Sequence, residues 1–321
     1  CGKNNAGWFY FNDRDSVYFQ GGYFVLCIDS MGKYKWMDRL AIPTLGNIYH
    51  KMCLAIDTIG NIYVTGSLYP TQFTSSNYGN QTIPTAPYRS SPFFARIAPD
   101  GRLIWMTYIS QLSFPSTELY LRVVSIVASA SGELYFTGTM LSQPLTIHST
   151  SGPDIITPVP TTQALMLGCY DSTGVIQWEH NINTVSYINQ NIDTYDIGSP
   201  GLGLGTDSHG NVYLSGYMAS NPIVFPSVSA TAYSYSTPDF YSICSYKPDG
   251  NFRWVTGVSA ALPYTSAGTY SMVTDKQDHI HVANFFKPLT TSTNSIQFLS
   301  TNGTYTALNM NGPSVYLLDY D

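Results

Sequence analysis

Charged residues are scarce in this chain of 321 residues. Only 11% of the residues are Asp, Glu, Lys or Arg, whereas soluble globular domains average about 25%. The 14 Lys and Arg residues are outnumbered by 20 Asp and Glu residues, which gives a formal net charge of -6. A protein that binds nucleic acid needs Lys and Arg to neutralise phosphates. The composition therefore excludes nucleic acid as a partner.

Long apolar runs, helical patterns and cysteine clusters are missing as well. No run approaches the roughly 20 apolar residues of a membrane-spanning helix, and no window sustains the 3.6-residue period of an amphipathic helix. The five cysteines show neither CxxC metal spacing nor the density of a disulfide-stapled domain. Hydrophobic residues nevertheless make up 44% of the chain, which is enough for a packed core. We therefore expect an all-β globular protein.

Catalytic motifs are also absent. The sequence contains no GxSxG elbow, no HExxH helix and no P-loop. The glycine-rich run at residues 201–205 precedes a strand turn and not a helix, so it does not predict a dinucleotide site. We expect no catalytic residues, no cofactor-binding residues and no metal ligands, and therefore no enzyme.

Two short phrases alternate along the chain. The clearest copies of the first are residues 60–66 (GNIYVTG), 132–138 (GELYFTG) and 210–216 (GNVYLSG), and weaker copies lie at residues 15–21 and 278–284. The second phrase is an apolar run, a turn containing Gly, and a Trp four residues after that Gly. Its copies end at Trp36, Trp105, Trp178 and Trp254. Each phrase is typical of a β-hairpin, in which two strands are joined by a tight turn.

Together the two phrases predict a repeated antiparallel unit of four strands, with an inner hairpin and an outer hairpin. One such sheet cannot bury both of its faces alone, so the units are expected to stack radially as blades. We expect one domain over residues 1–321, a five-bladed β-propeller of four-stranded blades. Its repeats cover about residues 7–40, 50–109, 120–182, 201–258 and 269–320.

This order of phrases resembles the β-propeller repeat known as the SBBP type, which occurs in arrays of secreted bacterial proteins and large DNA viruses. The resemblance covers nearly the whole chain and implies the propeller fold. It implies no site residues, because that family has no shared catalytic residues. Two repeats depart from the pattern. Only Gly21 and Gly22 separate the second and third strands of the first repeat, and Asp278 and His279 replace the Gly-Asn pair in the fifth.

The ends of the chain raise a question of closure. The last blade lacks its own outer strand, because no Trp-bearing strand follows residues 315–321, and an open strand edge is normally covered or paired. We expect residues 6–12 to complete that blade. A strand from a neighbouring subunit and a natural chain that continues further are the alternatives. Cys1 is compatible with the lipidated start of a bacterial lipoprotein, and a fragment boundary or a processed precursor explains it as well.

Four long connections join the second and third strands of the later repeats. They cover residues 67–91, 139–162, 217–238 and 287–312, whereas hairpin loops usually have 2–5 residues. Each contains a short apolar element, at residues 72–73, 145–147, 223–225 and 296–298, which predicts additional strands. The connections either form one uncharged face for a partner or only widen the blades. Two of them contain N-glycosylation sequons, at Asn80 and Asn302.

Three groups of residues invite a functional interpretation. The four repeat tryptophans suit sugar stacking, but their fixed place after a turn favours packing between blades. Acidic residues begin several turns, yet no run has the density of a Ca²⁺ loop, which favours hydrogen bonding within each turn. His279 and His281 alternate along a strand, and the sequence places no third ligand beside them, which favours a structural role over Zn²⁺ binding.

These observations favour a non-enzymatic scaffold for assembly or recognition at an exterior surface, such as a virion, an appendage or a cell envelope. We expect protein partners or self-assembly through the long connections and the edge of the last blade, and we expect no membrane span. The alternative is a propeller that binds a carbohydrate or another small ligand, as a secreted glycan-active protein or a surface lipoprotein.

Overall fold

The computed structural model of the chain describes residues 2–10, 16–41, 52–68, 91–111, 121–140, 144–157, 164–183, 203–218, 223–230, 232–235, 240–260, 264–288, 294–299, 305–310 and 314–320. These residues form strands and turns and no helix, so the prediction of an all-β protein is confirmed. Among them, no helix has the length and apolar character needed to cross a membrane.

Apart from one separate two-stranded hairpin, the described strands form five successive antiparallel sheets, which we number in chain order. The first sheet consists of β1 (Gly2–Tyr10), β2 (Ser16–Ile28) and β3 (Tyr34–Ala41). The second consists of β4 (Cys53–Ile56), β5 (Ile62–Leu68), β6 (Ser91–Ile97) and β7 (Leu103–Gln111). The third consists of β8 (Leu121–Ala128), β9 (Leu134–Met140), β12 (Ala164–Tyr170) and β13 (Ile176–Asn183).

The fourth sheet contains β14 (Gly203–Thr206), β15 (Val212–Met218), β18 (Phe240–Tyr246) and β19 (Phe252–Ala260). The fifth contains β20 (Tyr264–Thr274), β21 (Ile280–Pro288) and β24 (Ser314–Tyr320). In the second, third and fourth sheets, each phrase forms a hairpin and the two hairpins pair through their middle strands. The predicted strand order of these three repeats is therefore confirmed.

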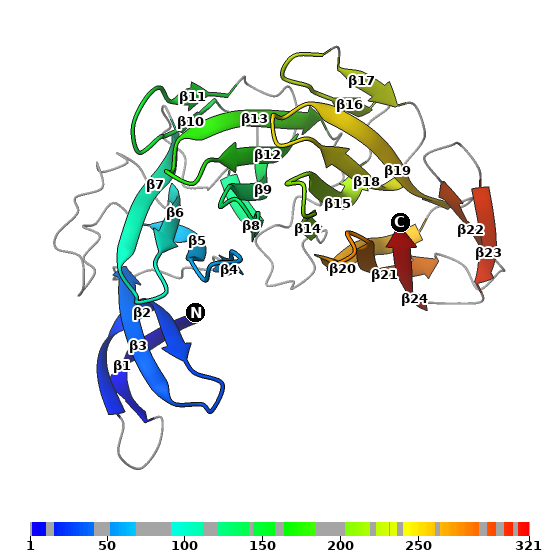
Figure 1. Cartoon of the computed structure of the whole chain (residues 1–321). Helices are drawn as coiled ribbons and strands as arrows, with labels where there is room; N and C mark the ends of the chain where they lie inside the picture. The colour runs from blue at the N-terminus through cyan, green and yellow to red at the C-terminus, as the bar shows by residue number, and fades with distance from the viewer. Residues whose placement is uncertain are drawn as a thin grey trace.

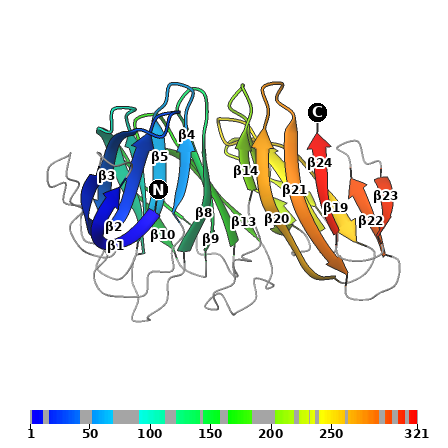
Figure 2. The same ribbon diagram turned by 90° about the horizontal axis from the view of Figure 1, so that it is seen from below.

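The sheets stand side by side along an open arc (Figure 1). Their first strands contact one another in sequence, β4 with β8, β8 with β14 and β14 with β20, and lie on the inner side of the arc. The strands β7, β13 and β19 lie on the outer side. Figure 2 shows the tight hairpin turns of successive sheets together at one end of the strands. We call this end the turn face.

An apolar cluster fills each seam between neighbouring sheets. Val25 of the first sheet packs with Phe93 and its neighbours in the second. Phe94 and Phe136 join the second sheet to the third, with ring centroids 4.7 Å apart. A large cluster of the same kind joins the third sheet to the fourth, and a smaller one joins the fourth to the fifth. Because both faces of the inner sheets are buried, their strands read as continuous apolar runs, as in the wholly buried β12.

The long connections form the predicted additional strands where the structure describes them. Strands β10 (Leu145–Ile147) and β11 (Ile155–Ile156) extend the second sheet beyond β7. Strands β22 (Asn294–Leu299) and β23 (Tyr305–Met310) extend the fourth sheet beyond β19.

The hairpin of β16 (Ile223–Phe225) and β17 (Tyr233–Tyr235) lies against β13. Each of these three connections thus covers the outer strand of the sheet before its own. The apolar element at residues 72–73 lies outside the described residues.

Two expectations about the first sheet are wrong. Gly21 and Gly22 do not separate two strands, because they lie within the continuous strand β2, so this sheet has three strands and not four. Residues 6–10 pair with residues 16–20 of the same sheet and do not complete the fifth repeat. A hairpin closed by a few residues costs far less loop-closure entropy than pairing with the opposite end of the chain.

The fifth sheet has three strands among the described residues. Its order is β20-β21-β24, and β24 forms one edge of the sheet. The described strands do not close into a ring (Figure 1).

Candidate functional site

The turns of the two phrases share one backbone geometry. The N–H of the first turn residue donates to the C=O of the fifth, and the N–H of the fourth donates to the C=O of the first, as in the turn from Asp57 to Asn61. The fourth residue has a positive φ. It is Gly in seven of the eight described turns and Asp278, with a φ of 67°, in the turn between β20 and β21.

An acidic residue at the first position holds several of these turns in shape. Oδ1 of Asp57 accepts hydrogen bonds from the backbone N–H groups of Ile59 and Asn61, at 3.1 and 2.8 Å. Asp207 and Asp275 accept the equivalent pairs in their own turns. The prediction that the turn aspartates serve hydrogen bonding within the turn is confirmed at these positions.

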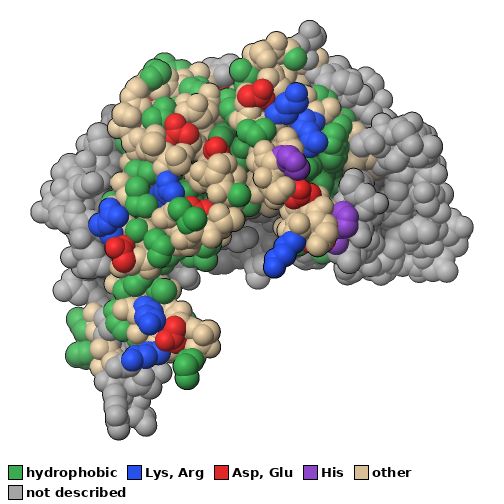
Figure 3. All heavy atoms as spheres, in the orientation of Figure 1, with side chains coloured by type: hydrophobic (Ala, Val, Ile, Leu, Met, Phe, Trp, Pro, Cys, Tyr) green, Lys and Arg blue, Asp and Glu red, His purple; other side chains and the backbone are tan. Residues whose placement is uncertain are grey.

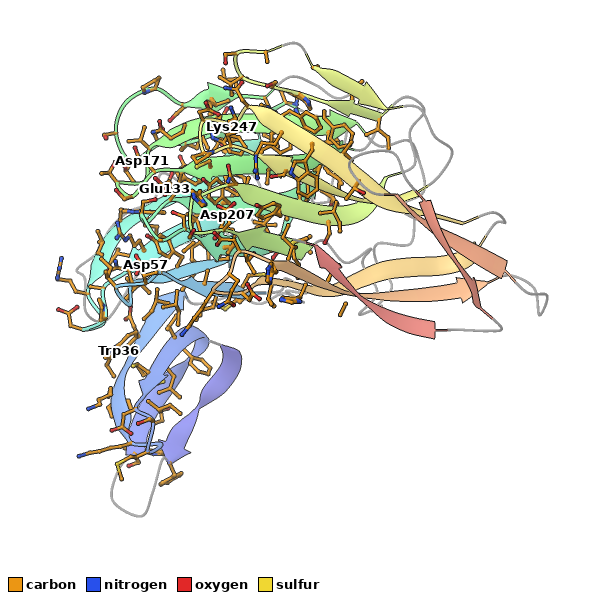
Figure 4. All side chains as sticks on the ribbon, turned by 45° about the vertical axis from the view of Figure 1, so that its right-hand side comes forward. Trp36, Asp57, Glu133, Asp171, Asp207 and Lys247 are labelled. Carbon is orange, nitrogen blue, oxygen red and sulfur yellow. The ribbon has the colours of Figure 1, made fainter. Side chains whose placement is uncertain are left out.

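The outer turns connect neighbouring sheets through tryptophan. The indole N–H of Trp105 donates to the C=O of Ser172, at 3.0 Å, in the next sheet. Trp36 and Trp178 make the same bond to Pro99 and Pro248, at 3.0 and 2.8 Å. The predicted packing role is confirmed for these three tryptophans. Figure 4 labels Trp36 of the first sheet together with the turn residues Asp171 of the third and Lys247 of the fourth.

The glycine of each outer turn is needed for this contact. A Cβ at Gly174 would lie 2.8 Å from the ring of Trp105, and its φ of +84° disfavours any side chain. Gly101 and Gly250 have the same relation to Trp36 and Trp178. The Trp and the Gly of successive repeats therefore form one packing unit.

The inner turns connect the sheets through tyrosine. The hydroxyl of Tyr63 donates to the C=O of Gly132 at 2.8 Å, and that of Tyr135 donates to the C=O of Gly210 at 2.8 Å. Burial raises the pKa of both phenols, so they remain neutral donors. The inner turns of the second to fourth sheets carry Asp57, Glu133 and Asp207, which Figure 4 labels.

The seam between the fourth and fifth sheets is built differently. The hydroxyl of Tyr213 donates to Asp207 Oδ2 of its own turn, at 2.7 Å. The link to the next sheet is made by Ser208, whose backbone N–H and hydroxyl donate to the carboxylate of Asp278, at 2.7 and 2.6 Å. A polar, half-exposed contact thus replaces the buried tyrosine bond of the earlier seams.

Three potential metal ligands converge on the inner turn of the fifth sheet. Oδ2 of Asp275 lies 3.2 Å from Nδ1 of His279 and 3.1 Å from Nε2 of His281. The three ligand atoms all lie within 4.8 Å of one another. The side chains are 30%, 39% and 29% exposed, in the same order.

Hydrogen bonds keep the carboxylate of this cluster ionised. Partial burial favours the neutral form of Asp275, but bonds from His281 and from the backbone of Gln277 and His279 outweigh it and lower the pKa to about 2. The pKa of Asp57 is also lowered: burial opposes ionisation there, and hydrogen bonds from Asn61 and Ile59 together with the charge of Arg96 overcome it. Both turns therefore hold a carboxylate anion at neutral pH.

The structure supplies the third ligand that we did not expect beside His279 and His281. Counted from the first residue of the inner turn, Asp275, His279 and His281 occupy the first, fifth and seventh positions. These positions are Asp57, Asn61 and Tyr63 in the second sheet. The signal was present in the sequence, because alignment of the repeats places Asp275 at the turn position that accepts hydrogen bonds from the other two.

The described cysteines and Glu179 are the next candidates for a reactive group. Cys27, Cys53, Cys169 and Cys244 form no disulfide bond among the described residues. Burial raises the pKa of Cys169 and Cys244, which disfavours reactive thiolates. Cys1 lies outside the described residues. Burial raises the pKa of Glu179 on β13 to about 8, and its Oε1 has no hydrogen-bond partner among the described residues.

Comparison with protein-family models finds no family that matches this chain, and comparison with curated proteins finds no match.

Proposed function

We propose that this chain is a non-enzymatic β-propeller scaffold that acts in assembly or recognition at an exterior surface, such as a virion, an appendage or a cell envelope. The repeated strand order and the adjacent first strands on the inner side of the arc support the propeller. The five repeats support a five-bladed ring related to the SBBP type of repeat. The described sheets would then be blades, and further contacts would complete the ring.

The observation that carries this proposal is the use made of the turn residues. The Trp, Tyr and Asp side chains that recur along the chain bond to the turn of their own or the next sheet, as Trp105 does to Ser172 and Tyr63 to Gly132. These residues therefore hold the sheets together. Because the recurring polar side chains are used to hold the sheets together, the outer loops and strand edges are the parts left to contact partners.

The periphery is suited to protein contacts. The strands β11, β23 and β24 each form one edge of their sheet, and such edges can pair with a strand from another chain. Figure 3 shows acidic and basic side chains interspersed over the turn face, with no large field of one sign in the described part of this view. The low total charge, 11% of residues, further favours neutral, hydroxyl-rich partner surfaces.

The proposal is tested by the mass of the purified chain in solution. Size-exclusion chromatography with light scattering, followed by negative-stain microscopy, is expected to show a disc or an assembly of discs with a defined number of copies. Binding of the same sample to a glycan array is expected to be absent. Tight binding of one class of glycan by a monomer would support the carbohydrate-binding alternative and contradict the scaffold.

A further inference from the structure

We propose that Asp275, His279 and His281 form a binding site for a divalent transition-metal ion of the Zn²⁺ class. This site goes beyond the proposed scaffold function and does not depend on it. Imidazole nitrogen and carboxylate oxygen are ligands that Zn²⁺ accepts in proteins, and sites with three protein ligands leave a position for water or another molecule.

The distances between the ligand atoms fit such an ion. Zn²⁺ binds nitrogen and carboxylate oxygen at about 2.0–2.2 Å, so two ligands of a tetrahedral site lie roughly 3.3 Å apart. Oδ2 of Asp275 is 3.2 Å from Nδ1 of His279 and 3.1 Å from Nε2 of His281. The remaining pair, the two imidazole nitrogens, lies within 4.8 Å. Binding of one ion to all three atoms would bring the two nitrogens to about 3.3 Å from each other.

The turn holds the carboxylate in position for this role. Oδ1 of Asp275 is occupied by the backbone N–H groups of Gln277 and His279, at 2.8 and 3.0 Å, which leaves Oδ2 for the ligand position. The backbone of the turn is closed by bonds from Asp275 to His279 and from Asp278 to Asp275. His281 follows on β21 between the buried residues Ile280 and Val282, which anchor the strand. Supports of this kind orient the ligands of known metal sites.

The equivalent turns of other sheets are unsuited to a cation. In the second sheet, Asn61 and Tyr63 stand where the two histidines stand in the fifth, and the guanidinium of Arg96 lies 3.4 Å from Asp57 Oδ2. In the fourth sheet, the guanidinium of Arg253 lies 3.2 Å from the hydroxyl of Tyr213. Each of these carboxylates therefore has a positive charge nearby and donors that do not bind Zn²⁺.

The fifth sheet also has a different type of residue at the paired register position. Strand register pairs Tyr63 with Arg96 in the second sheet and His281 with Asp319 in the fifth. A basic residue at this register position is thus replaced by an acidic one. The side chain of Asp57 is 1% exposed, whereas that of Asp275 is 30% exposed, so an ion from solution can reach the fifth-sheet cluster.

The competing explanation is purely structural. The two imidazoles could donate hydrogen bonds to Asp275 as Asn61 and Tyr63 do to Asp57. This explanation predicts that the double variant His279→Asn/His281→Tyr, which restores the residues of the second sheet, behaves as the wild-type chain does toward metals. The metal site predicts that this variant folds and loses the ion. The double variant therefore separates the two explanations.

The experiment uses the full chain without a polyhistidine tag. Isothermal titration calorimetry with ZnCl₂, and the visible absorption of added Co²⁺, measure stoichiometry, affinity and the ligand field. The double variant is compared with His209→Asn, a matched control that removes a histidine which is 77% exposed and lies 3.5 Å from Asp278 outside the cluster. Asp275→Asn is the second test variant, because an amide oxygen can still cap the turn.

One Zn²⁺ per wild-type chain is expected, with a rise in Tm on metal addition because the ion binds the folded state. Affinity is expected to fall by at least about 100-fold in the double variant and at least about tenfold in Asp275→Asn, and to remain unchanged in His209→Asn. Absence of binding to the wild-type chain would overturn the site. Equal binding by the wild-type chain and a folded double variant would also overturn it.

Discussion

The seam between the second and third sheets and the seam between the fourth and fifth are built from the same repeat with different side chains. In the first of these seams, Tyr63 and Trp105 reach across to carbonyl groups of the next turns and are almost fully buried. In the second, Ser208 bonds to the carboxylate of Asp278, and half-exposed histidines replace the amide and the phenol of the inner turn.

The comparison shows that the backbone geometry of a turn can be kept while the side chains that join it to the next sheet change. The Asp275 turn keeps the backbone bonds and the capping carboxylate of the Asp57 turn. Histidine replaces the buried tyrosine of that turn, and the carboxylate of Asp275 is partly exposed to solvent. The Asp57 turn thus only stabilises the molecule, whereas the equivalent Asp275 turn leaves its carboxylate accessible to a ligand.

The largest effect is expected for Trp105→Ala. The indole is 6% exposed, packs on Gly174 and bonds to Ser172. Its loss leaves a cavity in the seam and is expected to lower the free energy of unfolding by about 3–5 kcal/mol. Urea denaturation followed by circular dichroism measures the change.

The comparison variant is Trp254→Ala, which truncates the half-buried tryptophan of the fourth sheet. Trp254 packs on Tyr213 of its own sheet. Its truncation is expected to cost clearly less than that of Trp105. Equal losses would show that the indole contact with the next turn adds nothing to the seam.

The next effect concerns the two capping carboxylates. Asp57→Ala removes the acceptor for Asn61 and leaves the partly buried guanidinium of Arg96 without its carboxylate. We expect a loss of about 3 kcal/mol. Asp275→Ala is expected to lose much less in the absence of metal, because water can solvate its partners. Thermal unfolding of both variants checks this order, and a larger loss for Asp275→Ala would contradict it.

A pH-dependent effect is expected at Glu179. Its register partner is Gly168 on β12, and the next pair on the same face joins Met166 of the cluster between the second and third sheets to Asn181. The folded pKa is about 8, above the ordinary value of 4.5. The folded state therefore retains a proton that the unfolded chain releases, and stability falls as the pH rises from about 4.5 to 8.

Glu179→Gln is expected to remove this dependence. The variant should match the wild-type chain below pH 4 and exceed it at pH 8 by about 2 kcal/mol, since one pKa unit corresponds to about 1.4 kcal/mol and a buried amide recovers only part of the cost. Denaturation at several pH values measures the difference. Glu133→Gln is the control, because hydrogen bonds from Ser129 and Ser131 overcome the opposing effect of burial and lower the pKa of Glu133. A flat pH profile of the wild-type chain would contradict the expectation.

The smallest effects are expected for single hydroxyl groups. Tyr63→Phe removes the bond to Gly132 across a buried seam and is expected to cost about 1–2 kcal/mol. Ser208→Ala removes one bond to the half-exposed Asp278 and should cost less. Differential scanning calorimetry can rank the pair. The reverse order would show that the polar seam contributes more than the aromatic one.

Much of the fold could be predicted because the same turn sequences recur in successive repeats. A Gly at a position with positive φ and a Trp four residues later sufficed to locate the outer hairpins, and the inner phrase located the others. The first sheet could not be predicted in this way. Its Gly21-Gly22 pair is compatible with a turn or with an extended strand, and local sequence does not decide between them.

The candidate site could be predicted only in part. Alternation along a strand placed His279 and His281 together, but the contact with Asp275 depends on how the turn folds back on itself. The partners of Tyr63 and Trp105 lie in other repeats and cannot be inferred from local periodicity. Hydrogen bonds between sheets depend on how neighbouring repeats pack against each other, which the sequence of one repeat does not specify.

Hydrogen–deuterium exchange of the intact chain tests the central claim, that seam chemistry and not turn geometry sets the stability of each sheet. Slow exchange is expected in β5, β6, β9 and β12. Faster exchange is expected in residues 271–274 of β20 and 280–283 of β21, which pair without a register shift but border the polar seam. Equal protection of both regions, or slower exchange in β20 and β21, would contradict the account.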